Sequence, residues 1–270
     1  MSNEASCSGK WLCIGGVVGF TNSAVVITQC SNEGVINNSH YATYIKLGGI
    51  AGHLAGAAMV DESFNRGTVS NSYASSNSSS NTVPNIQLGG IVGNMAHASV
   101  VINGCTNFGS IVNTGRLSSG GVGKIMTVGG IVAVVSAGGS ITNCINAGLV
   151  SNAGKVITAR CYTGGIMGYC YGTAMDKFWE NVNTGDINMS GTRDYENCVG
   201  GVAGYVKGVA MTFENCRNTG NITNTAVRDK DDKLDDTEAP AQCFGGIIGL
   251  SDGGGSLGAC SNAGAILNDN

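Results

Sequence analysis

The chain has 270 residues, and its 44 glycines, 2 prolines and 12% of charged residues exclude several classes of protein. Low charge with a mean hydropathy of +0.11 argues against a disordered chain, and the lack of proline and of a Gly-X-Y period excludes collagen. The net charge of −4 offers no basic surface to nucleic acid, and the glycine content argues against long helices.

A first motif, Gly-Gly-(Ile/Val)-x-Gly, recurs along the whole chain, with Ala133 replacing the last glycine once. Its seven copies begin at residues 15, 48, 89, 129, 164, 200 and 245. The residues that flank each glycine pair are mostly Ile, Leu and Val, and β-branched residues in short runs bounded by glycine are typical of strands.

A second motif, Cys-x-Asn-x-Gly-x-(Ile/Val), follows each copy of the first. Its copies begin at residues 30, 63, 105, 144, 181, 216 and 260, with Ser63 and Asn181 in place of the cysteine. The step from the first motif to the second is 15 to 17 residues, whereas the step to the next first motif ranges from 18 to 29. One connection is therefore fixed and the other varies, and we expect insertions to emerge on one side of the structure.

These repeats predict an all-β fold. No window keeps an apolar i, i+3, i+4, i+7 pattern over three turns, so little helix is expected. We predict a parallel β-solenoid, or β-helix, of seven repeats of 33–45 residues that form a single domain over residues 1–270. Stacked coils would lie about 4.8 Å apart and align equivalent side chains in ladders. The pattern leaves open whether one repeat makes one coil or two.

An asparagine at the centre of the second motif is present in every copy. Asparagine tolerates a left-handed backbone and glycine supplies positive φ, so this motif predicts a turn, and stacked amides are expected to hydrogen-bond from coil to coil. We interpret this ladder as structural rather than as a binding site. Its members are Asn32, Asn65, Asn107, Asn146, Asn183, Asn218 and Asn262.

The alternation of GGIVG-like and CINAGLV-like segments, over about residues 13 to 268, resembles the Glug motif repeats of bacterial surface proteins. The chain departs from that pattern in its Asn-x-Gly, where Ala-Thr-Gly is common, and in its longer insertions. The resemblance implies a cell-surface or secreted β-solenoid, and it implies no catalytic residues because the motif has none.

Eleven cysteines leave two interpretations open. Cysteines on the ladder act as small apolar core residues, or equivalent cysteines in adjacent coils lie close enough for disulfides. The candidate pairs are Cys105–Cys144, Cys198–Cys243 and Cys216–Cys260. An odd total leaves at least one thiol unpaired in a monomer.

No cofactor or metal site is expected. His40, His53 and His97 fall at different phases of the repeat, and no Cys-x-x-Cys occurs. The long insertion at residues 223–243 holds the acidic run of residues 228–238, which lacks the pattern of a calcium loop and is predicted to be a solvated loop.

Catalysis finds weak support in the sequence, and we expect a protein that is not an enzyme. The best candidates for acid–base chemistry cluster in the fifth repeat: Asp176, Glu180, Asp186 and Asp194. A groove that brought the first three together beside Trp179 or Tyr171 would favour the alternative function, a carbohydrate-binding or carbohydrate-cleaving β-helix.

The expected function is that of a structural solenoid, a filament subunit or adhesin-type module at the cell surface or outside the cell. No signal peptide or membrane-spanning segment is recognised in the sequence. No capping segment is recognised after residue 266 either, so the expected partners are a second copy stacked end to end or neighbouring domains of a surface protein, with a glycan or protein receptor as a further candidate. No nucleic-acid partner is expected.

Overall fold

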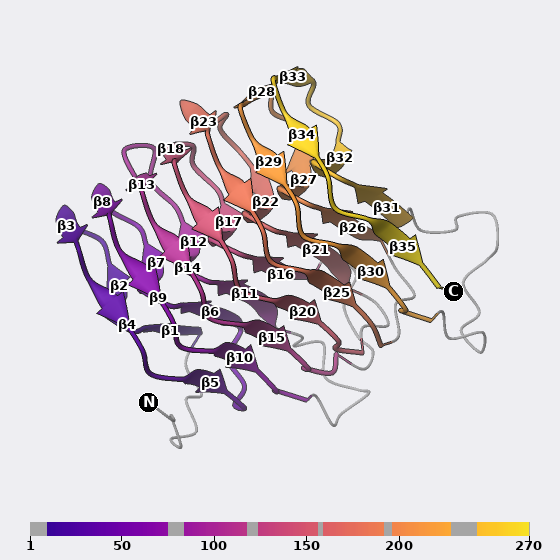
Figure 1. Cartoon of the computed structure of the whole chain (residues 1–270). Coiled ribbons are helices and arrows are strands. Elements are labelled where there is room, and N and C mark those ends of the chain that lie inside the picture. Colours follow the sequence, from indigo (N-terminus) through magenta and orange to yellow (C-terminus); the bar gives the residue numbers. More distant parts are fainter. Residues whose placement is uncertain are drawn as a thin grey trace.

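The computed structural model describes residues 10–74, 84–117, 124–155, 159–191, 196–227 and 242–269. These residues form strands joined by turns, with no helix among them, and they confirm the predicted parallel β-solenoid of seven repeats. Each repeat makes one coil of five short strands, and the indigo first coil and the yellow last coil lie at opposite ends of the stack (Figure 1).

Five parallel sheets run the length of the solenoid, each with one strand from every coil, and we number them I to V in the order that the chain visits them. Sheet I consists of β1 (Trp11–Gly15), β6 (Tyr44–Gly48), β11 (Asn85–Gly89), β16 (Ile125–Gly129), β21 (Arg160–Gly164), β26 (Asn197–Gly200) and β31 (Gln242–Gly245). Sheet II consists of β2 (Val18–Thr21), β7 (Ala51–Leu54), β12 (Val92–Met95), β17 (Val132–Val135), β22 (Met167–Tyr171), β27 (Ala203–Lys207) and β32 (Ile248–Ser251).

The other three sheets complete each coil. Sheet III consists of β3 (Val25–Thr28), β8 (Ala58–Asp61), β13 (Val101–Asn103), β18 (Ser140–Thr142), β23 (Lys177–Trp179), β28 (Met211–Glu214) and β33 (Gly255–Gly258). Sheet IV consists of β4 (Ser31–Asn32), β9 (Phe64–Asn65), β14 (Thr106–Asn107), β19 (Ile145–Asn146), β24 (Val182–Asn183), β29 (Arg217–Asn218) and β34 (Ser261–Asn262). Sheet V consists of β5 (Ile36–Asn38), β10 (Val69–Asn71), β15 (Ile111–Asn113), β20 (Val150–Asn152), β25 (Ile187–Met189), β30 (Ile222–Asn224) and β35 (Ile266–Asn268).

The sequence repeat and the strand register coincide. The first glycine of each pair lies beside its equivalent in the next coil, as Gly15 does beside Gly48. The variable connection runs from sheet V to sheet I of the next coil, and it is short after β5 and long after β30. Insertions therefore leave the solenoid along one edge, as the constant and variable steps predict. Residues 228–241, which include the acidic run, lie outside the described residues.

The two sequence motifs meet across the interior of each coil. A Cβ atom added to Gly130, the second glycine of its pair, would lie 2.5 Å from Cγ of Asn146 in the same coil. Every other coil shows the same approach of the second glycine to the asparagine of sheet IV. Only glycine leaves room for the amide. The two walls of the coil therefore come close together where the two motifs meet, and we call this narrow part of the coil the pinch.

The asparagines of sheet IV form one continuous hydrogen-bond ladder. Nδ2 of each residue donates to Oδ1 of the next, as from Asn65 to Asn107 at 2.8 Å, and it also donates to a backbone oxygen two residues ahead, as from Asn65 to Gly67 at 2.8 Å. The other five links measure 2.7 to 2.8 Å. The ladder thus joins all seven coils and satisfies amides that are buried in the middle of the stack.

The predicted positive φ at this motif is wrong. The asparagines lie in extended strands, and none of the motif glycines has positive φ. Left-handed backbone instead occurs one residue before the motif, as at Gln29 and Asn143, whose φ values are 53° and 54°. The motif glycine is needed for close approach, because a Cβ atom on Gly148 would lie 2.0 Å from the carbonyl oxygen of Gly109 in the preceding coil.

The pinch divides the interior into two apolar compartments. Side chains of sheets II and III, such as Val132 and Phe178, fill one compartment, and side chains of sheets I and V, such as Leu88 and Ile111, fill the other. A second asparagine ladder, not anticipated from the sequence, runs through sheet V, as from Asn71 to Asn113 at 3.0 Å, and Met189 interrupts it.

Candidate functional site

A groove on the outside of the solenoid is the candidate functional site. The inward pinch at the glycine pair makes the outer faces of sheets I and II face each other. The third glycine of the first motif brings the two sheets together, since a Cβ atom on Gly93 would lie 2.8 Å from the carbonyl oxygen of Leu47. Beyond this contact the outer side chains pair across the groove, as Gln87 does with Asn94 and Tyr162 with Tyr169.

The central part of this groove holds a pocket of about 290 Å³ that spans the second to the fifth coil. Five accessible and three buried side chains line it. The accessible ones are Tyr44, Asn85, Gln87, Ile125 and Tyr171, and the buried ones are Thr127, Val134 and Tyr169. The lining therefore contains aromatic rings, amides and a hydroxyl, and it contains no charged residue.

Several polar groups of the groove have no hydrogen-bond partner among the described residues. The Thr127 hydroxyl and Oδ1 of Asn94 are buried and unpartnered. The Asn94 amide does donate from Nδ2 to Oε1 of Gln87 at 3.0 Å, which holds the Gln87 side chain in place. A buried polar group without a partner costs stability, and in native proteins it often marks the position of a water or a ligand.

A cluster of tyrosines closes the pocket on the side of the later coils. The ring of Tyr169 lies 4.7 Å from that of Tyr162, 5.0 Å from that of Tyr171 and 5.5 Å from that of Tyr205. Burial, followed by the charge of neighbouring groups, raises the pKa of Tyr169 to about 12. The phenol is therefore neutral at physiological pH and offers an aromatic face and a hydroxyl.

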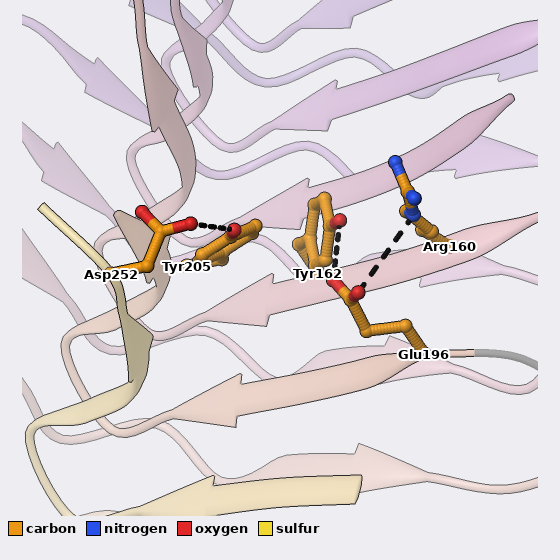
Figure 2. A network of polar contacts seen from close by, with 5 residues as sticks. All are labelled: Arg160, Tyr162, Glu196, Tyr205 and Asp252. Carbon is orange, nitrogen blue, oxygen red and sulfur yellow. Dashed lines mark hydrogen bonds and ion pairs between the residues drawn. The ribbon is translucent and has the colours of Figure 1, made fainter. Parts of the chain in front are cut away.

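Two acidic residues hold the outer tyrosines of this cluster (Figure 2). The Tyr162 hydroxyl donates to Oε1 of Glu196 at 2.7 Å, and the Tyr205 hydroxyl donates to Oδ2 of Asp252 at 2.7 Å. Glu196 also pairs with Arg160, with 3.8 Å between Oε2 and Nε. Burial and then these carboxylates raise the pKa values of Tyr162 and Tyr205, so both phenols act as donors that fix the rings rather than as acids or bases.

The other end of the groove carries a buried cation. Nζ of Lys46 lies 4.2 Å from the ring centroid of Trp11, and burial lowers the pKa of Lys46 to about 8. His53 packs against the same tryptophan, and burial together with Lys46 lowers its pKa to about 4. This end therefore differs from the pocket, because it combines a cation with aromatic rings.

The acidic residues that sequence analysis singled out do not line this pocket. Asp176 and Glu180 lie at the two ends of β23, so their Cα atoms are about 13 Å apart at the rise of an extended strand. Asp186 lies beyond β24, and its Oδ1 accepts a hydrogen bond from the backbone of Asn221. Glycosidase carboxyl groups stand about 5 to 9.5 Å apart across a cleft, and these residues are instead spread along the coil. Asp194 lies outside the described residues.

Of the two aromatic residues expected beside those acids, only Tyr171 belongs to the pocket. Trp179 lies in sheet III beneath Lys177, whose Nζ is 5.0 Å from its ring centroid. Sequence analysis missed Tyr44, Gln87 and Thr127 because they come from different repeats. Their common position relative to the repeat was nevertheless visible in the sequence, since Gln87 and Thr127 lie two residues, and Tyr44 four residues, before a glycine pair.

The three candidate cysteine pairs lie in adjacent coils, and the structure contains all six residues as thiols. Cys198 and Cys243 are direct neighbours in sheet I. The thiols of the other two pairs donate to backbone carbonyls, as from Cys144 to Thr142 at 3.2 Å and from Cys216 to Glu214 at 3.5 Å. Burial raises the pKa of Cys144, and it raises that of Cys216 to about 12. Disulfide formation at these pairs stays a prediction.

No group of three His, Cys, Asp or Glu side chains in the described part of the chain is arranged to hold a metal ion. The same residues contain no helix long and apolar enough to cross a membrane. No family model, no curated protein and no solved structure matches the chain.

Proposed function

We propose that the chain is a non-enzymatic structural β-solenoid that associates end to end with a second copy of itself. The observation that carries this proposal is the open face of the last described coil. Leu257 and Ile266 are 57% and 44% exposed there, whereas Phe213 and Ile222, their equivalents one coil earlier, are 1% and 0% exposed. Ladder residues that are core elsewhere thus form an apolar surface at this end.

The polarity of the asparagine ladder supports a head-to-tail contact. Among the described residues, Asn262 donates from Nδ2 to the backbone of Gly264 and to no asparagine, whereas Nδ2 of each preceding ladder asparagine also reaches the next amide. At the opposite end, Oδ1 of Asn32 accepts from the backbone of Gly34 and from none of the asparagines in the described ranges. A second copy in the same register would pair these two amides, and such a heterologous contact builds open filaments.

The resemblance to Glug repeats of surface proteins supports a place at the cell surface or outside the cell. A rigid body of stacked coils suits a stalk or an adhesin-type module, whose partners would be neighbouring domains or a receptor. This part of the proposal rests on the resemblance and on the fold.

Electron microscopy and light scattering of the purified chain test the association. We expect filaments or concentration-dependent oligomers, and we expect Ile266→Lys to abolish them because it places a charge on the apolar end face. Phe108→Lys is the matched control, since Phe108 is 51% exposed but lies on the side of a middle coil. A wild-type chain that stays a monodisperse monomer at high concentration would overturn the proposal.

A further inference from the structure

We propose that the pocket in the outer groove binds a neutral pyranose sugar. The inference is independent of end-to-end association, because the pocket lies on the side of the solenoid between the second and fifth coils. The argument rests on the size of the pocket, on the charge of its lining and on the groups that the lining leaves without partners.

The size of the pocket suits one sugar ring. At about 290 Å³ it lies just below the range of about 300–1,000 Å³ that is typical of sites for drug-sized ligands, which fits a smaller molecule such as a single sugar ring.

The charge of the lining selects a neutral ligand. The lining contains no Asp, Glu, Lys, Arg or His, and burial raises the pKa of Tyr169 to about 12. Two charged sites lie next to the lining: Arg160 and Glu196 pair with each other at 3.8 Å, and Lys46, the neighbour of Gln87 in sheet I, has its Nζ 4.2 Å from the ring centroid of Trp11. Binding a charged ligand here would cost its desolvation, and none of the lining residues supplies a counter-charge to offset that cost.

The polar groups of the lining match a molecule with many hydroxyl groups. Among the described residues, the Thr127 hydroxyl is unpartnered, and the Gln87 amide uses only its oxygen, in the bond from Asn94. The Asn85 side chain likewise uses its oxygen, which accepts from the backbone of Ile125 at 3.0 Å. The two amides therefore offer N–H donors, and the hydroxyl both donates and accepts, which are the complements of sugar hydroxyl groups.

The aromatic rings supply the remaining contact. A pyranose has one face of C–H groups that packs on an aromatic ring, and the stack of Tyr171 on Tyr169, with 27° between the rings, presents such a surface. Tyr171 is 39% exposed, which leaves its ring accessible to a ligand. Tyrosine is also rigid, so little conformational entropy is lost when the ligand binds.

Titration calorimetry and saturation-transfer NMR with defined sugars test the proposal. The probes are glucose, galactose, mannose, N-acetylglucosamine and their β-1,4-linked disaccharides, with galacturonic acid as the charged comparison. The measurements use the Ile266→Lys chain, so that a failure of end-to-end association does not affect the result. We expect at least one neutral sugar to bind with its C–H face saturated, and galacturonic acid to bind more weakly.

Variants then locate the site. Tyr171→Ala should weaken binding about tenfold or more, and Thr127→Val should weaken it several-fold while leaving the thermal unfolding midpoint unchanged or raised, because the hydroxyl has no partner to lose. Trp179→Ala is the matched control, since it removes an exposed aromatic ring of the same coil outside the pocket. The proposal is overturned if no neutral sugar binds, if galacturonic acid binds as tightly, or if Tyr171→Ala binds as the unsubstituted protein does.

Discussion

The middle coils and the end coils carry the same motif residues, yet those residues differ in burial and therefore in their contribution to stability. In the middle of the stack a motif side chain contacts a coil above and a coil below. In the last described coil one of these neighbours is absent, and the exposed fraction rises from 0% at Ile222 to 44% at Ile266. The contribution of a repeat residue to stability therefore depends on its neighbours in the stack, and a comparison of the repeat sequences alone does not reveal it.

The largest difference in stability loss between a middle coil and an end coil is expected at the glycine of the second motif. Gly148→Ala would place Cβ 2.0 Å from the carbonyl oxygen of Gly109, and it should cost about 4 kcal/mol or more. Gly34→Ala, at the same motif position in the first coil, meets only Oδ1 of Asn32 at 3.6 Å, and should change stability by about 1 kcal/mol or less. Urea unfolding followed by circular dichroism measures both, and equal losses would contradict the role given to the preceding coil.

The apolar ladder of sheet V gives the next contrast. Ile222→Ala should destabilise the chain by about 2–5 kcal/mol, because it leaves a cavity in a closed compartment. Ile266→Ala should cost about 1 kcal/mol or less, since its side chain is 44% exposed. Thermal unfolding at low protein concentration, where end-to-end contacts are absent, provides the comparison. A loss at Ile266 as large as that at Ile222 would show that this end is covered.

Substitutions in the asparagine ladder should show the same contrast between a middle coil and an end coil, with smaller losses of stability. Asn107→Ala removes two donated hydrogen bonds and the acceptor used by Asn65, and it should cost about 3 kcal/mol. Asn262→Ala removes one donated bond to Gly264 and the acceptor used by Asn218, and at this partly exposed end it should cost about 1–2 kcal/mol. The free energies of unfolding in urea test this difference, and a ladder that contributes nothing would show equal, small losses.

The smallest effect on stability is expected at the cysteines. The contrast there is one of thiol reactivity, which is measured in the folded chain. Cys144 is fully buried and its pKa is raised by burial, whereas Cys260 in the last coil is only partly buried. Iodoacetamide at pH 8 should therefore label Cys260 in the native protein and Cys144 only after unfolding, as read by peptide mass spectrometry. Labelling of Cys260 that requires a reductant would instead support the Cys216–Cys260 disulfide.

Much of the fold could be predicted because the repeat constrains it. Ile and Val recur at fixed positions beside glycine and asparagine, and parallel stacking buries these apolar residues in every repeat. The constant spacing from the first motif to the second, and the variable spacing to the next repeat, locate the edge at which insertions leave the solenoid. The turn at the second motif could not be predicted in the same way. Asparagine and glycine favour left-handed backbone locally, but the stack uses them in extended strands, since an amide ladder and a close approach stabilise them more.

The pocket was beyond the reach of sequence analysis for a related reason. Its residues come from four coils and two sheets, and none of them is a repeated motif residue. Acidic residues close in sequence, such as Asp176 and Glu180, drew attention to the fifth repeat, but an extended strand separates neighbours by about 3.3 Å per residue and spreads them along the coil. In a solenoid, residues that meet share a phase of the repeat rather than a segment of the chain.

The sequence by itself determined the parallel stacking, the number of repeats and the asparagine column, because only stacked strands satisfy the period of the motifs. The tertiary structure decided that each repeat makes one coil of five strands. The tertiary structure decided that the glycine pair packs against that column across the coil. This pinch depends on two segments about 15 residues apart that meet through the interior, and no local preference specifies such a contact. It folds the outer faces of sheets I and II toward each other, and the groove with its pocket is the result.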